Sequence, residues 1–369
     1  MISAGWATER GERQKRRQLV QADFDQLARA GFTRTGVPES HGGVWRSIEE
    51  STGPVCDMLR VLAHGDSSVA LVAAMHPSVL LVFGWLSVTE ADGVYQAAWD
   101  EQREWAFGTA IEGHFWGTIT SESGSGGDVS KTRSTAKLEN GQYRMTGTKH
   151  FGSGSGMTSF MVTTAVPEGE SGPESFFMDM RDVVMDGSGG VKLIAPWDGH
   201  GMTATQSHTI AFVDFPVTRR AWPNAGDQIR SVATASVQCM FTAVIVGIVE
   251  VAVRTAREQL SGKKDSLTPY EQVEWSQVEV EAWQIQQFYV GMLRAIEDPE
   301  TRAFQSLLAK TAVAQVSESL LARLSKVIGG SAFSRHAPYG AWAQDVRALG
   351  FLRQPWGLAF DQIHDASWS

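Results

Sequence analysis

The stretches Ile119-Thr-Ser-Glu-Ser-Gly-Ser-Gly-Gly-Asp128 and Gly147-Thr-Lys-His-Phe-Gly-Ser-Gly-Ser-Gly156 enclose a short segment with the pattern of a β-hairpin. Between them, residues 134–138 and 142–146 alternate as strands do, and the intervening Asn140-Gly141 strongly favours a tight turn. Small residues in such turns expose backbone N–H groups and hydroxyls. The sequence therefore predicts a hairpin bracketed by two Gly/Ser-rich turns that can face a flat, electron-rich ligand.

The composition is that of an ordinary globular protein. The chain has 369 residues, of which 43% are hydrophobic and 20% are charged, so two or three domains are expected. Its 32 basic and 41 acidic residues give a formal net charge of −9. This acidic balance argues against a nucleic-acid partner, because phosphate binding requires clustered Lys and Arg.

Features of the termini, cysteines and apolar runs predict a cytoplasmic protein without a membrane span. Cys56 and Cys239 form neither a disulfide framework nor a Cys-x-x-Cys metal site. Residues 10–17 are polar, which is unlike the apolar core of a signal peptide. The longest apolar run, residues 68–86, contains a His-Pro-Ser interruption and is interpreted as a buried helix pair.

The order of periodic patterns predicts a segregated α+β fold. Helical periodicity dominates residues 12–105, and Gly31 is placed as a residue that ends the first helix. Short strands are expected over residues 118–217. Three long helices are then predicted, at residues 244–260, 269–296 and 301–327. Helices, a β-module and a helical bundle in this order indicate three domains, at residues 1–115, 116–222 and 223–369.

Seven short motifs, taken in order, resemble the acyl-CoA dehydrogenase superfamily. They are Gly31-Phe32 with Val37-Pro-Glu-Ser-His-Gly-Gly43, Ser121-Glu-Ser-Gly-Ser-Gly-Gly-Asp128, Gly147-Thr-Lys-His-Phe-Gly-Ser153, Gly201-Met-Thr-Ala-Thr-Gln-Ser207 with residues 212–217, Arg257-Glu-Gln-Leu260 with Gln272, Gly329-Gly330, and Gln344-Asp345. The resemblance implies an N-terminal helical domain, a middle β-barrel domain and a C-terminal four-helix bundle. It also implies a flavin cofactor.

By position, the resemblance assigns residues to the flavin ring. Thr120 and Ser121 are expected to face its pyrimidine side. Phe151 stands where the family often has a stacking Trp, and Ser153 stands where it has a Thr bonding near N5. An isoalloxazine ring needs a dry platform and donors toward its edge, which these residue types can supply.

A second set of residues is assigned to the dinucleotide part of the cofactor. Arg257 is expected to neutralise pyrophosphate as a forked donor, with Leu260 and Gln272 gripping the dinucleotide of a neighbouring subunit. Gly329 and Gly330 are expected to let backbone N–H groups approach it. These assignments imply FAD, with FMN as the alternative, and a homo-oligomer that is a dimer or a tetramer.

Departures from the family's dehydrogenases argue against thioester desaturation. That reaction requires a carboxylate base above the ring, but the two positions where the family places it hold Arg353 and Gln238. Gly127 also replaces a Ser associated with CoA recognition. The run after Lys149 is closer to the family's flavin monooxygenase branch, although a His common in that branch is absent at Leu352.

The favoured hypothesis is therefore a monooxygenase that hydroxylates a small organic substrate with reduced flavin and O₂. A separate flavin reductase is expected, because the chain has no nicotinamide-binding Gly-x-Gly-x-x-Gly unit. One alternative is a dehydrogenase whose base is Glu122 or Asp345, and another is a non-catalytic member without flavin.

Three candidate residues remain open between functional and structural roles. Arg353 is either a catalytic-site cation that binds an anionic substrate or an exposed helix-end residue. His76 is either a catalytic residue of the substrate pocket or a core histidine. Glu122 is either an acid or base or, as favoured, a brace that bonds backbone N–H groups in its loop.

Overall fold

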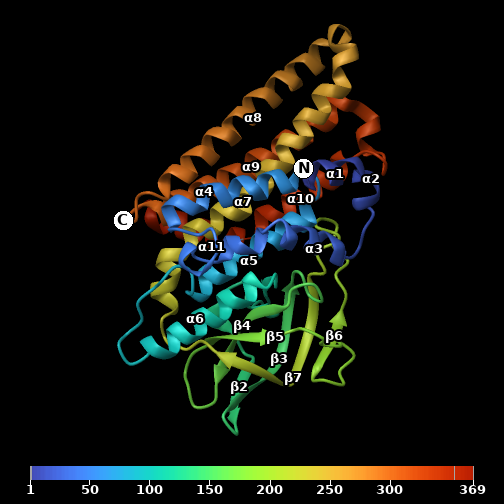
Figure 1. The fold of residues 1–369 in the computed structure, drawn as a ribbon. Helices are drawn as coiled ribbons and strands as arrows, with labels where there is room; N and C mark the ends of the chain where they lie inside the picture. Colours follow the sequence, from blue (N-terminus) through green and yellow to red (C-terminus); the bar gives the residue numbers. More distant parts are fainter. Residues whose placement is uncertain (1, 353, 369) are drawn as a thin grey trace.

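A computed structural model describes residues 2–352 and 354–368 of the chain. Helices at both ends of the sequence form the upper body of the molecule, and the strands form a separate body below them (Figure 1). The expected order of helices, β-barrel and helices is confirmed. The division into three independently folding domains stays a prediction.

The N-terminal helices are α1 (Ile2–Thr8), α2 (Arg10–Arg13), α3 (Gln21–Arg29), α4 (Ile48–Ala63), α5 (Ser67–Phe83) and α6 (Gln96–Ile111), with the 3₁₀ turns Phe32–Gly36 and Glu39–His41. As predicted, Gly31 follows the end of α3 with a positive φ of 83°. The expected helix pair is wrong, because α5 continues through Pro77 as one helix. Burial on nearly all of its sides stabilises the helix enough to offset the missing hydrogen bond.

The strands are β1 (Trp116–Thr118), β2 (Thr135–Glu139), β3 (Gln142–Gly152), β4 (Phe160–Pro167), β5 (Glu174–Asp179), β6 (Val191–Ala195) and β7 (His208–Arg219), with a 3₁₀ turn at Val129–Lys131. Strands β4, β2, β3, β7 and β5 pair in a closed circuit, because β5 returns to β4. The result is a small barrel, with β1 added beside β4 and β6 beside β7. Closure leaves few free edges.

The predicted hairpin is confirmed as β2 and β3. Glu139 pairs with Gln142 across the turn, and Asn140 and Gly141 have φ values of 51° and 81°. Two successive left-handed residues match the twist of the flanking strands, which is why Asn-Gly predicts this turn. The barrel has its own core, to which Met145, Phe176 and Phe212 belong.

The C-terminal helices are α7 (Gly226–Leu260), α8 (Pro269–Ala295), α9 (Arg302–Ile328), α10 (Tyr339–Phe351) and α11 (Trp356–Ala366), with 3₁₀ turns at Ser261–Ser266 and Gly329–Phe333. Helices α7 to α10 pack on one another as a bundle (Figure 1). Helix α8 begins with a capping box at Thr268 and Glu271, as its predicted start requires.

Helix α7 begins at Gly226 rather than at the predicted residue 244. Residues 235–249 in its middle are all buried, so they lack the one-sided pattern used to locate helices, and the turns before them place only Ile229 and Ala233 in the core. The span Gly226–Ser266 is long and apolar enough to cross a membrane, but 89% of its apolar window is buried inside the protein. Such burial is typical of a core helix.

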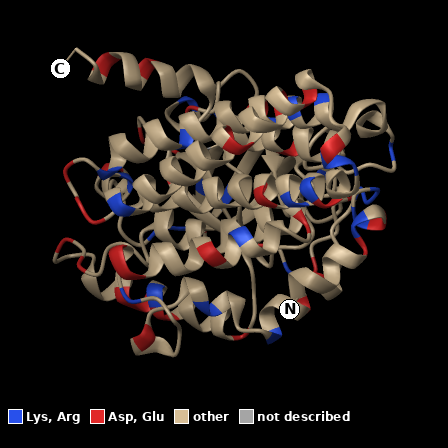
Figure 2. Cartoon of the chain, turned by 90° about the horizontal axis from the view of Figure 1, so that it is seen from above, with Lys and Arg blue, Asp and Glu red and all other residues tan. Residues whose placement is uncertain are grey.

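The N-terminal and C-terminal helices share one hydrophobic core. Seen from above, basic and acidic residues are interspersed over these helices, without a one-signed face in this view (Figure 2). Helices α4 and α7 approach closely at Gly247, where an added Cβ would overlap the carbonyl oxygen of Arg60 and lie 2.9 Å from the Cβ of Ala63.

We expect Gly247→Ala to lower the free energy of unfolding by about 2 kcal/mol, because the added methyl overpacks the α4–α7 contact. Gly291→Ala in α8 is the matched control, since nothing lies within 4 Å of its Cβ position. The control should gain about 0.5–1 kcal/mol from helix propensity. Urea unfolding of both variants measures the difference, and equal effects would contradict the close crossing.

Candidate functional site

An exposed aromatic residue stands at a distorted end of strand β3. The pairing of β3 with β7 shifts register between Lys149 and Gly152, and Phe151 lies in this bulge. Phe151 has a φ of 58° and its side chain is 60% exposed. The left-handed region is costly for a bulky residue, and such strain clusters at functional sites. Phe151 is therefore the centre of the candidate site.

The first Gly/Ser turn lies beside this bulge. The N–H of His150 donates to the carbonyl of Ser121 over 2.8 Å, as an isolated bridge between the turn and β3. Thr120 and Ser121 thus lie next to the segment that carries Phe151 and Ser153. The structure brings together four residues that the sequence assigned to the flavin ring. Their contacts with a ring stay a prediction.

A buried ion pair holds the two turns together. Glu122 accepts hydrogen bonds from the Nζ of Lys149 at 2.7 Å, from the backbone N–H of Arg133 at 2.8 Å and from both N–H and hydroxyl of Ser134. Burial alone would raise the pKa of Glu122, but these donors outweigh it and lower the pKa to about 2. The predicted brace is confirmed, and Glu122 is not a free base.

A loop between β6 and β7, residues 197–207, covers the second turn. Trp197 meets Phe151 edge to face with ring centroids 6.1 Å apart, and its Nε1 donates to the carbonyl of Met202 over 2.9 Å. Met202 and Gln206 have positive φ values of 51° and 49°. Strained backbone thus recurs on this side of the candidate site.

Helix α10 anchors this loop through Asp345. The carboxylate accepts from the N–H of Met202 at 2.6 Å and from the hydroxyl of Ser67. The backbone of the loop also lies directly on α10, because a Cβ at Gly201 would overlap the carbonyl oxygen of Gln344. Glycine is required there by the close approach.

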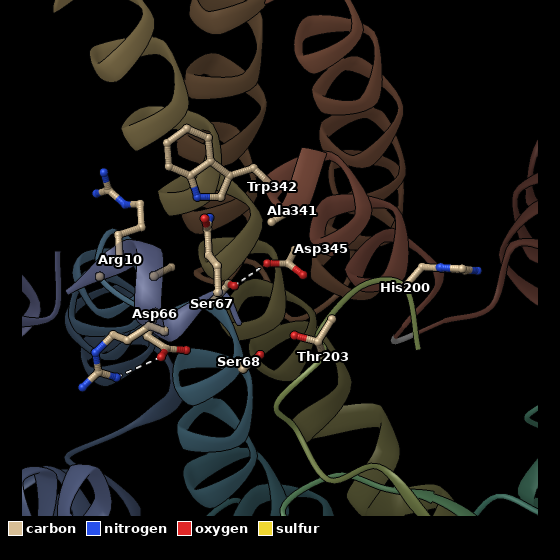
Figure 3. Close-up of a pocket in the computed structure, with 13 residues that line it drawn as sticks. Arg10, Asp66, Ser67, Ser68, His200, Thr203, Ala341, Trp342 and Asp345 are labelled. Carbon is tan, nitrogen blue, oxygen red and sulfur yellow. Dashed lines mark hydrogen bonds and ion pairs between the residues drawn. The ribbon is translucent and has the colours of Figure 1, made fainter. Parts of the chain in front are cut away.

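Three separate parts of the chain meet around this anchor. Figure 3 shows Asp66 and Ser67 at the start of α5, Thr203 and His200 in the loop, and Asp345 on α10. Burial raises the pKa of Asp345 to about 6, against the opposing effect of its two donors. Its oxygens are engaged in holding the loop, which makes Asp345 a positioning residue.

The contacts of His76 favour the core-histidine alternative over the catalytic one. Its side chain is fully buried, with Nε2 2.7 Å from the carbonyl of Thr33 and Nδ1 accepting from the N–H of Trp116 over 3.1 Å. Both ring nitrogens are thus used inside the core, and burial lowers the pKa of His76 to about 4. A catalytic role of His76 stays a prediction.

The residues assigned to the dinucleotide lie at the end of the bundle far from the barrel (Figure 1). Arg257 pairs with Glu279 at 2.7 Å, and the Nε2 of exposed Gln272 donates to the carbonyl of Leu267. Leu260 is only 4% exposed and packs in the helical core, and its contact with the dinucleotide stays a prediction. Within one chain this group does not meet Phe151.

Gly329 ends α9 with a φ of 78°, and Gly330 is exposed beside it. Their conformation is explained by the helix end alone, so their cofactor contact stays a prediction. Arg353 lies outside the described residues, and its predicted role stays a prediction as well.

The connection between α10 and α11 approaches the first Gly/Ser turn. A Cβ at Gly127 would lie 2.9 Å from the ring of Pro355. Buried Lys310 on α9 stabilises this connection by donating to the carbonyls of Gly350 and Gln354, each over 2.8 Å. Burial lowers the pKa of Lys310 to about 8. The helical body therefore approaches this turn at Gly127, while the turn stays largely exposed.

Sequence reasoning did not assign roles to several residues that shape this site, namely Trp197, Met202, Thr205, Ser207 and Lys310. The stretch containing Met202, Thr205 and Ser207 was recognised as a family motif, which was the available indication. Lys310 directly follows the apolar run Leu307-Leu-Ala309, and a Lys on the core face of a helix is typically partnered.

Glu122→Gln should lower the free energy of unfolding by about 3 kcal/mol at pH 7, because it leaves the Lys149 ammonium buried without a counter-charge. The double variant Glu122→Gln/Lys149→Met should recover most of this loss. The Glu122 carboxylate contributes its full share to the free energy of unfolding above its ordinary pKa of 4.5, and this share is lost as the pH falls toward 2. The difference in unfolding free energy between wild type and Glu122→Gln should therefore shrink over that pH range. Chemical denaturation between pH 3 and 7 provides the test. A difference independent of pH, or no recovery in the double variant, would contradict the ion pair.

Comparison with known proteins finds similarity in sequence and in fold. No family model matches the chain. It is 25% identical over 353 residues to the amino sugar nitrososynthase DnmZ of Streptomyces peucetius, covering 89% of this chain and 81% of that protein.

Two solved structures show the same fold over nearly the whole chain. KijD3 in complex with FMN and a dTDP-linked amino sugar matches with a TM-score of 0.81 and 19% identity, covering 100% of this chain and 91% of KijD3. FMN-bound TdsC from Paenibacillus sp. A11-2, a dibenzothiophene monooxygenase, matches with a TM-score of 0.79 and 20% identity, covering 99% and 94%. The chain therefore has the acyl-CoA dehydrogenase-like fold, and its structural neighbours belong to the monooxygenase branch of that fold.

Proposed function

We propose that this chain is a flavin-dependent monooxygenase that acts on a small organic substrate. The observation that carries the proposal is Phe151, an aromatic ring held exposed by a strained bulge beside two turns rich in hydroxyl and N–H groups. A planar, apolar surface next to small polar residues is the chemistry that a flavin ring requires. The FMN bound to structures of the same fold supports it.

The residues of the site have separate tasks in this proposal. Phe151 supports one face of the ring, while Thr120, Ser121 and Ser153 bond its polar edge. When bound and reduced, the flavin supplies two electrons, so that one atom of O₂ enters the substrate and the other leaves as water. The Glu122–Lys149 pair keeps the two turns at a fixed separation.

The dehydrogenase alternative lacks a base among the described residues considered for it. Glu122 is fully engaged and has a pKa of about 2. Asp345 holds the 197–207 loop. Gln238 is neutral and buried, and accepts a hydrogen bond from Ser306 over 2.6 Å. These contacts favour oxygenation over removal of a proton from an acyl thioester.

FMN is the better proposal for the cofactor than the FAD expected from the sequence. Two of the residues that suggested FAD make contacts within the protein instead: Arg257 pairs with Glu279, and Leu260 is buried. KijD3 and TdsC were both solved with FMN. FMN needs no dinucleotide grip, so the loss of these contacts is consistent with it.

The substrate and partners follow from the same reasoning. Amine oxidation is the chemistry in the name of DnmZ, and indole or a dTDP-sugar is bound in solved neighbours, so a small amine or heteroaromatic compound is proposed. Arg353 is retained as the candidate cation for an anionic substrate group. A separate flavin reductase and a cytoplasmic location complete the proposal.

A homo-oligomer is proposed from an unpartnered apolar strip on α8. The strip consists of Tyr270, Val273, Val280, Trp283 and Val290, and Trp283 is 64% exposed. A second copy of this chain is the proposed occupant, because the sequence resemblance implies a homo-oligomer. Large exposed apolar patches of this kind are unusual on monomers.

Phe151→Gly should raise the Kd for FMN about tenfold, because it removes the surface on which the flavin ring stacks. It should also raise the free energy of unfolding by about 1 kcal/mol, because glycine adopts the left-handed backbone conformation without strain. Asn140→Gly, at another exposed left-handed position, is the control and should leave FMN binding unchanged. Fluorescence titration and urea unfolding give the two quantities. An unchanged FMN affinity in Phe151→Gly would contradict stacking of the flavin ring on Phe151.

Oxygenation itself is tested with FMN, NADH, an added flavin reductase and ¹⁸O₂. The probes are indole, dibenzothiophene and the dTDP-linked amino sugar bound by KijD3. Mass spectrometry should find one ¹⁸O atom in at least one product, and Phe151→Gly should lower its yield. FMN binding without incorporation into any probe, together with bleaching of the flavin by an acyl-CoA, would favour the dehydrogenase.

Trp283→Glu should convert the oligomer to a smaller species at micromolar concentration, because it places a charge in the apolar strip. Val94→Glu is the matched control, as Val94 is 87% exposed in a loop outside the strip. Sedimentation velocity gives the masses. A wild-type protein that sediments as a monomer would exclude the proposed interface.

A further inference from the structure

A chain of three hydroxyl groups connects the candidate flavin site to the interior of the 197–207 loop. The oxygens of Ser153 and Ser207 are 2.8 Å apart, and those of Ser207 and Thr205 are 2.7 Å apart. The chain ends where Thr205 Oγ1 lies 2.8 Å from the carbonyl oxygen of Met202. Each separation is that of a good O–H···O hydrogen bond.

The carbonyl at the end of the chain sets the direction of every hydrogen bond in it. A carbonyl oxygen only accepts, so the hydroxyl hydrogen of Thr205 must lie between Thr205 and Met202. The opposite arrangement would leave two oxygens 2.8 Å apart with no hydrogen between them, which is repulsive. Since a hydroxyl has one hydrogen, Ser207 must then donate to Thr205.

The same argument determines the hydroxyl of Ser153. The hydrogen of Ser207 is used toward Thr205, so the hydrogen of Ser153 must point at Ser207. Ser153 therefore offers lone pairs, and no hydrogen, to any group that lies over Phe151. Thr205 is fully buried and Ser207 nearly so, which shields the chain from water that could reverse it.

We propose that Thr205 and Ser207 orient the Ser153 hydroxyl as an acceptor, so that the site prefers reduced flavin over oxidised flavin. The inference rests on the proposed function, in which Ser153 bonds the polar edge of the flavin ring, with N5 as the edge atom that the sequence resemblance implies for it. In reduced flavin N5 carries a hydrogen that Ser153 can accept. In oxidised flavin N5 is itself an acceptor, and it would face lone pairs of Ser153 at short range.

This preference suits an enzyme that takes reduced flavin from a separate reductase. Reduced flavin would be retained for the reaction, and oxidised flavin would be released afterwards for the next reduction. Thr205 and Ser207 are positioning residues in this scheme, because they act on the flavin only through Ser153. Asp345 and Trp197 support them by holding the N–H and the carbonyl of Met202.

The test compares the affinities of the full-length protein for oxidised and reduced FMN, measured anaerobically. In the wild type, reduced FMN should bind at least tenfold more tightly. Ser207→Ala frees the hydrogen of Ser153, and Thr205→Val lets Ser207 donate to Ser153 instead. Each variant should lower the preference about tenfold, which corresponds to a fall of about 30 mV in the two-electron potential of bound FMN.

Thr311→Val is the control, because it removes a buried hydroxyl in α9 that bonds the carbonyl of Leu307. It should leave the preference unchanged. If wild type, Ser207→Ala and Thr205→Val all bind FMN with the same ratio of affinities for its two forms, the inference is overturned, whereas the proposed function is not. A wild-type protein that binds neither form of FMN would overturn the proposed function and this inference with it.

A neutron structure of the deuterated protein gives a readout that does not depend on flavin. It should locate the deuterium of Ser153 between Ser153 and Ser207, and that of Thr205 toward Met202. Deuterium on Ser207 pointing at Ser153 would overturn the inference even if FMN binds.

Discussion

The buried ion pair between Lys149 and Glu122 is the contact on which the candidate site depends. Lys149 is fully buried, and removing an ammonium from water is tolerated only when an opposite charge and further acceptors surround it. Glu122 meets that requirement because its turn is short and rich in small residues. One carboxylate thereby connects the first Gly/Ser turn, strand β3 and the start of β2. Phe151 lies two residues after Lys149, in the bulge of the same strand.

The helical body reaches the same site from the other side. Asp345 on α10 holds the loop that covers the second turn, while Lys310 on α9 holds the connection that touches the first. The candidate site is thus formed at a junction rather than inside the barrel. Its polar groups are set by main-chain contacts over long sequence separations, which leaves the side chains of Phe151 and Ser153 free to face a ligand.

Short-range chemistry explains which parts of this arrangement the sequence predicts. Asn140-Gly141, Gly31 and the Thr268 capping box act over a few residues, so the hairpin and the helix ends are read correctly. Glu122 is predicted as a brace for the same reason. The ordered motifs then identify the fold and imply a flavin, although no single motif does so.

Long-range packing explains the predictions that are wrong or incomplete. The start of α7 is missed because its first turns place only Ile229 and Ala233 in the core, and residues 235–249 after them are buried on every side and have no polar face to mark the helix. His76 and Leu260 are assigned by position, but their surroundings come from segments far away in sequence. The hydroxyl chain from Ser153 to Met202 depends on how one loop folds back, which residue types alone do not determine. The preference for FMN over FAD comes from the structural neighbours.

The single helical core shared by both ends of the chain has a consequence for biosynthesis. Thr52 on α4 bonds Ser236 on α7 at 2.9 Å, and Arg302 on α9 reaches back to Glu49. The apolar faces of α4 and α5 therefore leave the ribosome long before the helix that covers them is made. The barrel has its own core and can form first. Nascent chains should spend this interval with exposed helical surface, which is the period when chaperones are most needed.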